Sequence, residues 1–241
     1  MRIDVFGVEF DDITIELAAL RAFEMLRSDE KAYVVTPNPE IVWMTRRDEA
    51  LRSAVNNAEL VLPDGIGIIL GSRILGTPLR GGRVPGIDFA ASLLERMAAS
   101  GLSLFLFGAK PGIAELAGQR LRDKFPGLII AGTADGYYYD EGSLVGEINK
   151  AQPDVLFVCM GSPKQELWMT GNIERLDVKL CAGLGGSLDV FAGIQKRAPA
   201  FMQKLGLEWL YRLVREPSRI KRMIKLPLFV MALIWKRILG V

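Results

Sequence analysis

The sequence contains no histidine and only two cysteines among its 241 residues. Without histidine, the chain cannot use an imidazole as general acid or base, and it cannot build a Ser-His-Asp or Cys-His nucleophile or most zinc hydrolase centres. The two cysteines, Cys159 and Cys181, are too few for a structural zinc site. Because both lie in apolar runs, we expect them to be reduced core residues of a cytosolic protein and not a disulfide.

Long hydrophobic runs and common nucleotide motifs are also missing. The longest late apolar run, Leu226–Trp235, has ten residues, whereas a helix needs about 20 to span a bilayer. The first twelve residues lack the basic-then-apolar order of a signal peptide. Neither GxGxxG nor the P-loop pattern occurs, which disfavours a dehydrogenase or an ATPase. No DxD cluster is present to hold Mg²⁺ or Mn²⁺ on a nucleotide diphosphate, so we expect neither a metal nor another cofactor.

Charge is distributed unevenly along the chain. From Lys196 onward there are eleven Lys or Arg against two Glu, whereas the preceding 195 residues carry 19 Lys or Arg against 26 Asp or Glu. We therefore predict a body, residues 1–195, and a basic appendage, residues 196–241. A basic tail on an acidic body indicates an anionic partner, such as a membrane surface, a nucleic acid or a phosphate-bearing ligand.

Short apolar runs alternate with helical patterns through the body. The expected strands are Ile3–Val8, Ala32–Thr36, Leu60–Leu62, Ser103–Phe107, Leu128–Gly132, Val155–Met160 and Val178–Cys181. The expected helices are Ile13–Ser28, Pro39–Asn57, Ile66–Leu75, Ile87–Ser100, Ile113–Phe125, Ser143–Ala151 and Lys164–Asn172. This alternation predicts an α/β fold: a doubly wound, mostly parallel sheet with helices on both faces.

In such sheets, ligands bind beyond the carboxyl ends of the strands. Three segments that follow expected strands, Gly108–Gly112, Gly161–Glu166 and Gly183–Asp189, are glycine-rich and open into helical patterns. Unpaired backbone N–H groups at such turns favour a phosphate, and Lys110 and Lys164 add positive charge. The alternative is that these glycines only permit tight turns. Three such loops at one edge favour an anionic ligand.

Asp64 follows another expected strand, within Pro63-Asp64-Gly65. It is either the N-cap of the next helix or a carboxylate that takes a proton from an attacking hydroxyl. The absence of histidine favours the second reading. Thr36 and Asn38 follow the neighbouring strand and either orient a sugar or form a Pro-bounded turn. The run Tyr137–Tyr139, which follows Asp135 and Gly136, either stacks on a base or packs internally.

The tail, Lys204–Val241, is expected to form two or three short helices, with Pro217 and Pro227 as starts or breaks. Its apolar residues interleave with Lys and Arg, a pattern typical of a helix lying on anionic lipid. The alternative is a C-terminal helix docked on the body or in an oligomer interface. Nucleic acid is disfavoured because the apolar content is high and no binding motif accompanies the charge.

Five segments taken together closely resemble the WecG/TagA/CpsF glycosyltransferase family. They are Thr36–Glu40, Leu62–Gly65, Arg83–Gly86, Gly161–Glu166 and Gly185–Asp189, and the likeness extends over the whole chain. The resemblance is strongest to the branch that makes the wall teichoic acid linkage unit. It implies a Rossmann-like fold and an inverting, metal-independent transfer of N-acetylmannosamine from its UDP donor. The acceptor would be the 4-hydroxyl of N-acetylglucosamine on undecaprenyl diphosphate, at the inner face of the cell membrane.

The resemblance also implies roles for individual residues. Asp64 would be the base, with Thr36, Asn38, Arg83 and Gln165 beside it. Tail arginines would cover the site and meet the diphosphate, and we select Arg215, Arg219 and Arg222. The other expected substrate-binding residues lie in the loops: Gly65, Gly108, Lys110, Asp135, Gly136, Tyr137, Gly161, Pro163, Lys164, Glu166, Gly185 and Asp189. The resemblance further implies homodimers or homotrimers.

Three rival hypotheses remain at this stage. The same fold could use another UDP-hexose, such as the N-acetylmannosaminuronic acid or glucose donor, for exopolysaccharide or antigen synthesis. The chain could instead be a non-catalytic, nucleotide-sensing membrane adaptor. A dehydrogenase is the third reading, and the missing GxGxxG counts against it.

Overall fold

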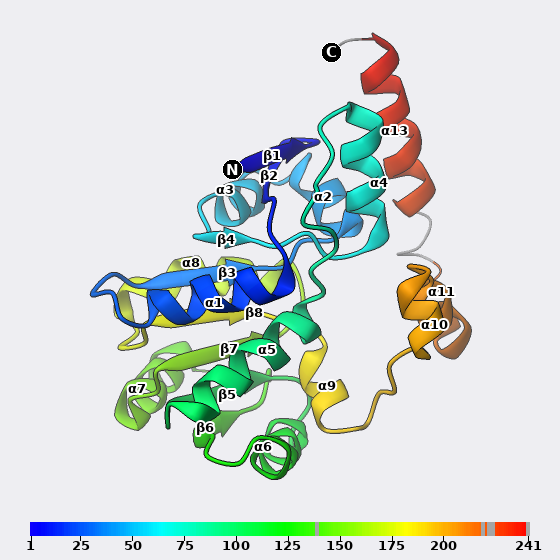
Figure 1. Ribbon diagram of the computed structural model, residues 1–241. Helices are drawn as coiled ribbons and strands as arrows, with labels where there is room; N and C mark the ends of the chain where they lie inside the picture. Colours follow the sequence, from blue (N-terminus) through cyan, green and yellow to red (C-terminus); the bar gives the residue numbers. More distant parts are fainter. Residues whose placement is uncertain (138–139, 218–219, 221–224, 240–241) are drawn as a thin grey trace.

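The computed structural model describes residues 1–137, 140–217, 220 and 225–239. Its main sheet has six parallel strands in the order β4-β3-β8-β7-β5-β6 (Figure 1). The strands are β3 (Ala32–Val35), β4 (Leu60–Val61), β5 (Ser103–Gly108), β6 (Ile129–Ala134), β7 (Val155–Cys159) and β8 (Leu180–Gly183). The predicted α/β class and parallel sheet are confirmed.

Alternate residues of each strand enter two separate cores, because successive side chains point to opposite faces. Val34 and Phe157 pack on the face covered by α1 (Ile15–Met25), α5 (Gly86–Ala99), α6 (Ile113–Lys124) and α9 (Ser187–Phe191). Val35 and Val158 pack on the other face, against α2 (Pro39–Thr45), α3 (Glu49–Asn56), α4 (Ile66–Leu75), α7 (Glu141–Ala151) and α8 (Lys164–Asn172). Helices therefore cover both faces, as predicted. Cys159 and Cys181 are buried and unpaired, in agreement with the sequence.

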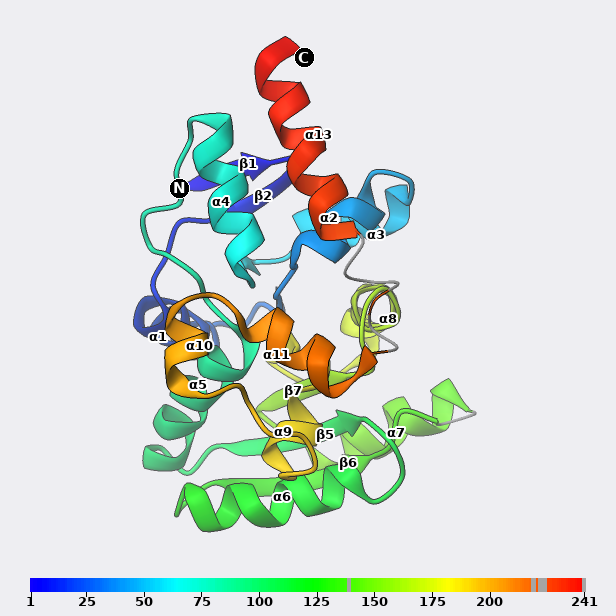
Figure 2. The same ribbon diagram turned by 90° about the vertical axis from the view of Figure 1, so that its right-hand side faces the viewer.

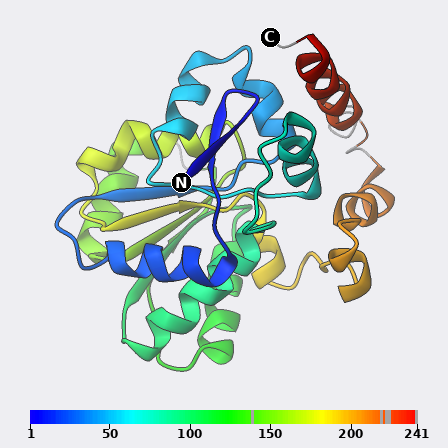
Figure 3. The same ribbon diagram turned by 45° about the horizontal axis from the view of Figure 1, so that its top comes forward.

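The first expected strand, Ile3–Val8, is wrong. The structure has an antiparallel hairpin there, β1 (Arg2–Val5) and β2 (Val8–Asp11), outside the main sheet and between the helices α2–α3 and α4 (Figure 3). Phe6 and Gly7 form its turn, both with positive φ (63° and 88°). A two-residue turn of this hand matches the right-handed twist of the strands. Because the apolar pattern continues through the turn, the sequence predicted a single strand over Ile3–Val8.

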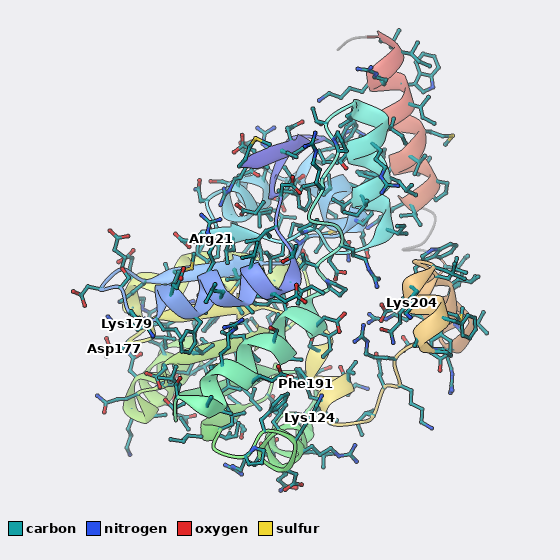
Figure 4. The ribbon with its side chains drawn as sticks, viewed as in Figure 1. Arg21, Lys124, Asp177, Lys179, Phe191 and Lys204 are labelled. Carbon is teal, nitrogen blue, oxygen red and sulfur yellow. The ribbon has the colours of Figure 1, made fainter. Side chains whose placement is uncertain are left out.

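Asp11 fastens this hairpin to the sheet. Its carboxylate is buried and accepts a hydrogen bond of 3.0 Å from the backbone N–H of Val61 in the edge strand β4. Arg2 lies 3.5 Å from the same carboxylate. Arg21, on α1 below the hairpin in Figure 4, lies 3.6 Å from it. The two guanidinium groups offset the cost of burying this charge.

The expected helix Pro39–Asn57 is two helices, and α9 was not expected. The first ends at Thr45, and Asp48 begins the second because its side chain accepts from the N–H of Leu51 at 2.9 Å and so caps α3. The bounds of α4 and α8 are those expected.

The tail returns along the edge where the parallel strands end. It contains α10 (Ala200–Lys204), α11 (Glu208–Arg215) and α13 (Lys225–Leu239), which form a column at the right of Figure 1 and face the viewer in Figure 2. In Figure 4, Lys204 lies on this side, whereas Lys179, which precedes β8, lies at the opposite edge. Within Lys204–Val241 the described residues form two of the expected helices, α11 and α13, but α13 has 15 residues and Pro227 lies in its first turn and does not break it. The division after residue 195 stays a prediction.

One face of α13 is docked on the body. Phe229 and Leu233 are fully buried in the core beside α4, at a point where Gly71 allows close approach. A Cβ on Gly71 would lie 2.8 Å from Leu233 Cδ1. Among the described residues, no helix is long and apolar enough to cross a membrane.

Candidate active site

The parallel sheet brings the loops that follow its strands to one edge. From one side of the sheet to the other, this edge carries Asp64 after β4, Thr36 and Asn38 after β3, Gly185 after β8, Gly161 after β7, Gly108 at the end of β5 and Asp135 after β6. Neighbouring strands lie about 4.8 Å apart, so Asp64 and Asp135 are separated by roughly 24 Å along the sheet. The candidate site is thus an elongated edge with Asp64 at one end.

Asp64 is held where the chain leaves β4. Its backbone N–H donates to Pro37 O at 3.3 Å, and Pro63 O accepts from the N–H of Val84 at 2.9 Å. The N-cap of α4 is Gly65, with φ of 92° and no side-chain cap bond. The carboxylate of Asp64 is therefore not used to cap that helix.

The surroundings of Asp64 raise its pKa to about 6. Burial is the largest cause, because it disfavours the charged form. The positive charges of Arg212 and Arg83 lower the pKa, and the negative charges of Glu208 and Asp88 raise it. A carboxylate with a pKa in this range is still ionised at neutral pH and is a better proton acceptor than an ordinary Asp.

An ionic cluster joins the tail to the body beside Asp64. Its centre is Glu208, a buried residue of α11. Arg83 Nη1 lies 3.3 Å from Glu208 Oε2, and Arg83 Nη2 also donates to Gln203 O at 3.3 Å. Arg212 lies 3.4 Å and Arg197 lies 3.7 Å from Glu208 Oε1. Arg197 also binds Asp88 through both terminal nitrogens.

Sequence reasoning selected Arg83 but missed its partners in this cluster. The available signal was that Glu208 is one of only two acidic residues in a strongly basic tail. Of the tail arginines that were selected, Arg215 is exposed, and its guanidinium lies 5.5 Å from the centre of the Tyr211 ring. Arg219 and Arg222 lie outside the described residues, so their contact with a diphosphate stays a prediction.

Thr36 and Asn38 both make structural hydrogen bonds at the end of β3. Thr36 Oγ1 donates to Gly183 O at 3.0 Å and so joins β3 to β8. Asn38 Oδ1 accepts from the N–H groups of Glu40 and Ile41 at 2.9 and 3.1 Å, as the N-cap of α2. The turn interpretation of Asn38 is therefore present in the structure, next to Asp64.

Gln165 is buried between the loops that follow β7 and β8. Its Oε1 accepts from the N–H groups of Gly161 and Gly185 at 3.2 and 2.9 Å. Its Nε2 donates to Glu166 Oε1 at 2.9 Å. Pro163 precedes α8 after a cis peptide bond, and Asp189 lies in the first turn of α9, behind the Gly185 loop.

The far end of the edge is hollowed. Lys110, Pro111, Asp135 and Tyr137 line a cavity of about 350 Å³, and the Tyr137 side chain is 55% exposed. Asp135 Oδ1 accepts from the N–H of Tyr137 at 2.8 Å. Tyr138 and Tyr139 lie outside the described residues.

Lys164 and Gly108 fix the conformation of the loops at this end of the edge. Lys164 Nζ donates to Gly136 O at 3.2 Å and so links α8 to the loop after β6. Gly108 has φ of 129°, and a Cβ there would lie 2.3 Å from Cys159 O. Only glycine fits at that position. Within the described residues, no group of three Cys, Asp or Glu side chains is placed to hold a metal ion.

A parallel α/β sheet with a pKa-shifted carboxylate and glycine loops at its carboxyl edge has the form of an enzyme site that binds a ligand beyond the strand ends. The model of the "Glycosyl transferase WecG/TagA/CpsF family" matches residues 3–240, and the chain belongs to that family. The resemblance seen in the sequence is thereby confirmed, and the protein is a glycosyltransferase.

Curated relatives give a more specific likeness. A protein of Bacillus spizizenii is 36% identical over 209 residues, which cover 87% of this chain and 81% of the relative. A protein of Staphylococcus aureus strain MRSA252 is 33% identical over 231 residues, which cover 95% and 91%. Both are named N-acetylglucosaminyldiphosphoundecaprenol N-acetyl-beta-D-mannosaminyltransferase.

Proposed function

We propose that this protein transfers N-acetylmannosamine from UDP-N-acetylmannosamine to the 4-hydroxyl of N-acetylglucosamine on undecaprenyl diphosphate, with inversion at the anomeric carbon. The product would be the linkage unit of wall teichoic acid. The observation that carries the proposal is Asp64, a partly buried carboxylate with a pKa of about 6 that feels the charges of Arg212 and Arg83, in a family whose relatives carry that name.

In this mechanism Asp64 is the general base. It takes the proton of the acceptor hydroxyl while that oxygen attacks the anomeric carbon and the bond to UDP breaks. Negative charge then develops on the departing diphosphate. Arg83 and Arg212 lie near Asp64 and can stabilise that charge without a metal ion. Both guanidinium groups form ion pairs with Glu208.

We assign the donor to the glycine loops and the acceptor to the Asp64 end. The diphosphate would meet N–H groups of the loops after β8 and β7, with Lys164 close by and Lys110 in the next loop, after β5. The uracil would enter the cavity beside Tyr137, whose exposed ring can stack on a base. Thr36 and Asn38 then border the acceptor sugar.

The tail supplies the proposed contact with the inner face of the cell membrane. Leu228, Met231, Trp235 and Ile238 recur at helical spacing on α13 and are exposed, Trp235 by 63%. They lie away from Phe229 and Leu233, which hold the helix on the body. Lys236 and Arg237 point to the body, where Lys236 lies 3.9 Å from Asp4 Oδ1 and Arg237 donates to Leu75 O at 3.5 Å. The support for a lipid surface is therefore the exposed apolar face of a helix in a basic tail. The same face would be covered in the homodimers or homotrimers that the resemblance implies.

The proposed reaction is tested with a panel of UDP-sugars and a lipid-linked N-acetylglucosamine diphosphate analogue, in the presence of EDTA. Product from UDP-N-acetylmannosamine alone is expected. Product from UDP-glucose or the N-acetylmannosaminuronic acid donor would keep the family chemistry and move the protein to another polymer. Product that requires added Mg²⁺ would contradict metal independence. If no donor reacts, transfer to this acceptor is refuted.

The membrane contact is tested by sedimentation with vesicles of phosphatidylglycerol and phosphatidylcholine. The double variant Met231→Ser/Trp235→Ser should bind the vesicles at least about tenfold more weakly, since two large apolar groups no longer enter the interface. Leu17→Ser, which removes an exposed leucine from α1, is the matched control and should bind as the unaltered protein does. Equal binding by all three proteins would contradict the proposed role of α13.

A further inference from the structure

The amide of Gln165 sits where its orientation matters. An amide can be turned by 180° with almost no change of shape, so only its hydrogen-bond partners decide which end is the oxygen. On one side of Gln165 are two donors, the N–H groups of Gly161 and Gly185. On the other side is an acceptor, the carboxylate of Glu166. Glu166 thus forces the oxygen to face the two glycines.

The two glycines belong to different strands of the sheet. Gly161 follows β7, and Gly185 follows β8. One oxygen atom therefore joins both loops, and the contact is close. A Cβ on Gly183 would lie 3.1 Å from Gln165 Nε2 and 2.8 Å from Met169 Cε. Thr36 Oγ1 extends the connection by its bond to Gly183 O, so β3 is tied to the same unit.

The burial of the Glu166 carboxylate is unfavourable for the stability of the fold. It is 1% exposed, and burial raises its pKa. Its second oxygen, Oε2, and Ser162 Oγ have no hydrogen-bond partner among the described residues, although Ser162 is near enough to lower the pKa of Glu166. Burying a carboxylate is unfavourable for stability unless it is well paired. Its hydrogen bond to Gln165 gives the carboxylate a task that an apolar residue could not perform.

We propose that Glu166 is a positioning residue: through the Gln165 amide it holds the glycine loops after β7 and β8 at the spacing that receives the donor's diphosphate. Neither side chain needs to touch the reacting atoms. The diphosphate part of the inference rests on the proposed function, whereas the coupling of the two loops rests on the hydrogen bonds alone.

Three variants test the coupling. Gln165→Glu places a second carboxylate against Glu166. Glu166→Gln keeps an acceptor oxygen for the amide of Gln165. The exchange Gln165→Glu/Glu166→Gln has the same composition and charge as the unaltered protein and restores a donor–acceptor pair in the opposite sense. In that exchange, the introduced carboxylate still accepts from Gly161 and Gly185.

Two readouts are measured for each variant: hydrogen exchange of the backbone amides of Gly161 and Gly185, and the Kd for UDP between pH 5 and pH 8. In Gln165→Glu, hydrogen exchange at the backbone amides of Gly161 and Gly185 should be faster. This variant should also bind UDP at least about tenfold more weakly at pH 8, because two apposed buried carboxylates repel. At pH 5 its affinity should recover, since a shared proton recreates the missing donor. The double variant Gln165→Glu/Glu166→Gln should have a Kd for UDP within about threefold of that of the unaltered protein at both pH values. The Kd of Glu166→Gln should lie between those of the double variant and Gln165→Glu.

The outcomes separate the two proposals. If the exchanged pair is as defective as Gln165→Glu in both readouts, the Gln165 amide itself contacts the ligand, and the positioning role of Glu166 is refuted. The positioning role is also refuted if Gln165→Glu leaves the rate of hydrogen exchange at the Gly161 and Gly185 amides unchanged. If the unaltered protein does not bind UDP, the proposed donor is wrong, while amide exchange still reports the coupling of the loops. Thermal unfolding of each variant shows whether it is folded.

Discussion

Replacing Asp64 by Asn should remove activity and, at neutral pH, make the protein more stable. The two effects have one cause. The site holds a carboxylate in surroundings that disfavour its charge, which raises its pKa from the ordinary 3.8 to about 6. That charge is useful for proton transfer and unfavourable for folding. Asparagine is nearly the same size, carries no charge and cannot accept the proton.

The size of the stability effect follows from linkage between protonation and folding. A carboxyl group that binds its proton more tightly in the folded state destabilises that state when pH exceeds both pKa values. For Asp64 the rise from 3.8 to about 6 corresponds to about 3 kcal/mol at pH 7.5, and to less than about 1 kcal/mol near pH 4. In a chain of this length, about 3 kcal/mol raises Tm by roughly 6–12 °C.

The assay compares Asp64→Asn with the unaltered protein by urea unfolding at pH 7.5 and pH 4, and by sugar transfer between pH 5 and pH 8. The variant should be more stable at pH 7.5, by an amount that shrinks toward pH 4. Its kcat should fall by on the order of 10²–10⁴, as loss of a general base requires, while UDP still binds. In the unaltered enzyme, kcat/KM should follow the ionised fraction of Asp64, about a tenth at pH 5 and about nine-tenths at pH 7.

Asp123→Asn, on the exposed surface of α6, is the matched control and should change neither stability nor turnover. The reasoning about Asp64 is refuted if Asp64→Asn is less stable than the unaltered protein at pH 7.5, or if the stability difference is the same at both pH values. Near-normal turnover would exclude Asp64 as the base.

Three further predictions concern the tail and the loops. Arg212→Gln removes a positive charge that lowers the pKa of Asp64, so the acid limb of kcat/KM against pH should move to higher pH; an unmoved limb would contradict this coupling. Phe229→Ala should cost about 3–5 kcal/mol in urea unfolding, because a fully buried ring is lost from beneath α13, and a loss under about 1 kcal/mol would mean that the helix is not docked. Gly183→Ala should weaken UDP binding by about tenfold in calorimetry, because the added Cβ would press on the Gln165 amide; unchanged affinity would show that the amide can shift freely.

The elements of the sheet were largely predictable from the sequence because they depend on local patterns. The helices α4 and α8 begin and end where their sequence signals indicate. The hairpin at Phe6 was missed because its turn has Phe and Gly in place of the Asn-Gly or Asp-Gly pairs that mark such turns. The boundary at Asp48 was available in principle, as a capping residue in the middle of a helical pattern.

The candidate site was predictable only in part. The loop residues could be found because parallel strands end at one edge. The ionic cluster could not, since Arg83 and Glu208 are 125 residues apart and their pairing depends on how the tail crosses the body. Likewise, no spacing shows that Gln165 bonds two loops, because Gly185 comes to it only through the pairing of β7 with β8.

The place of β8 in the sheet has a consequence for biosynthesis. This strand lies between β3 and β7, although it is the last of the six to be translated. A ribosome-bound chain that ends before residue 180 already contains Asp64 and all five other strands, yet they can form only two separate pieces, β4-β3 and β7-β5-β6. Their apolar edges stay open until β8 arrives and joins residues almost 150 positions apart. Such long-range closure is slow and exposes the nascent chain to aggregation. Transferase activity should therefore appear only near the end of synthesis, in one step.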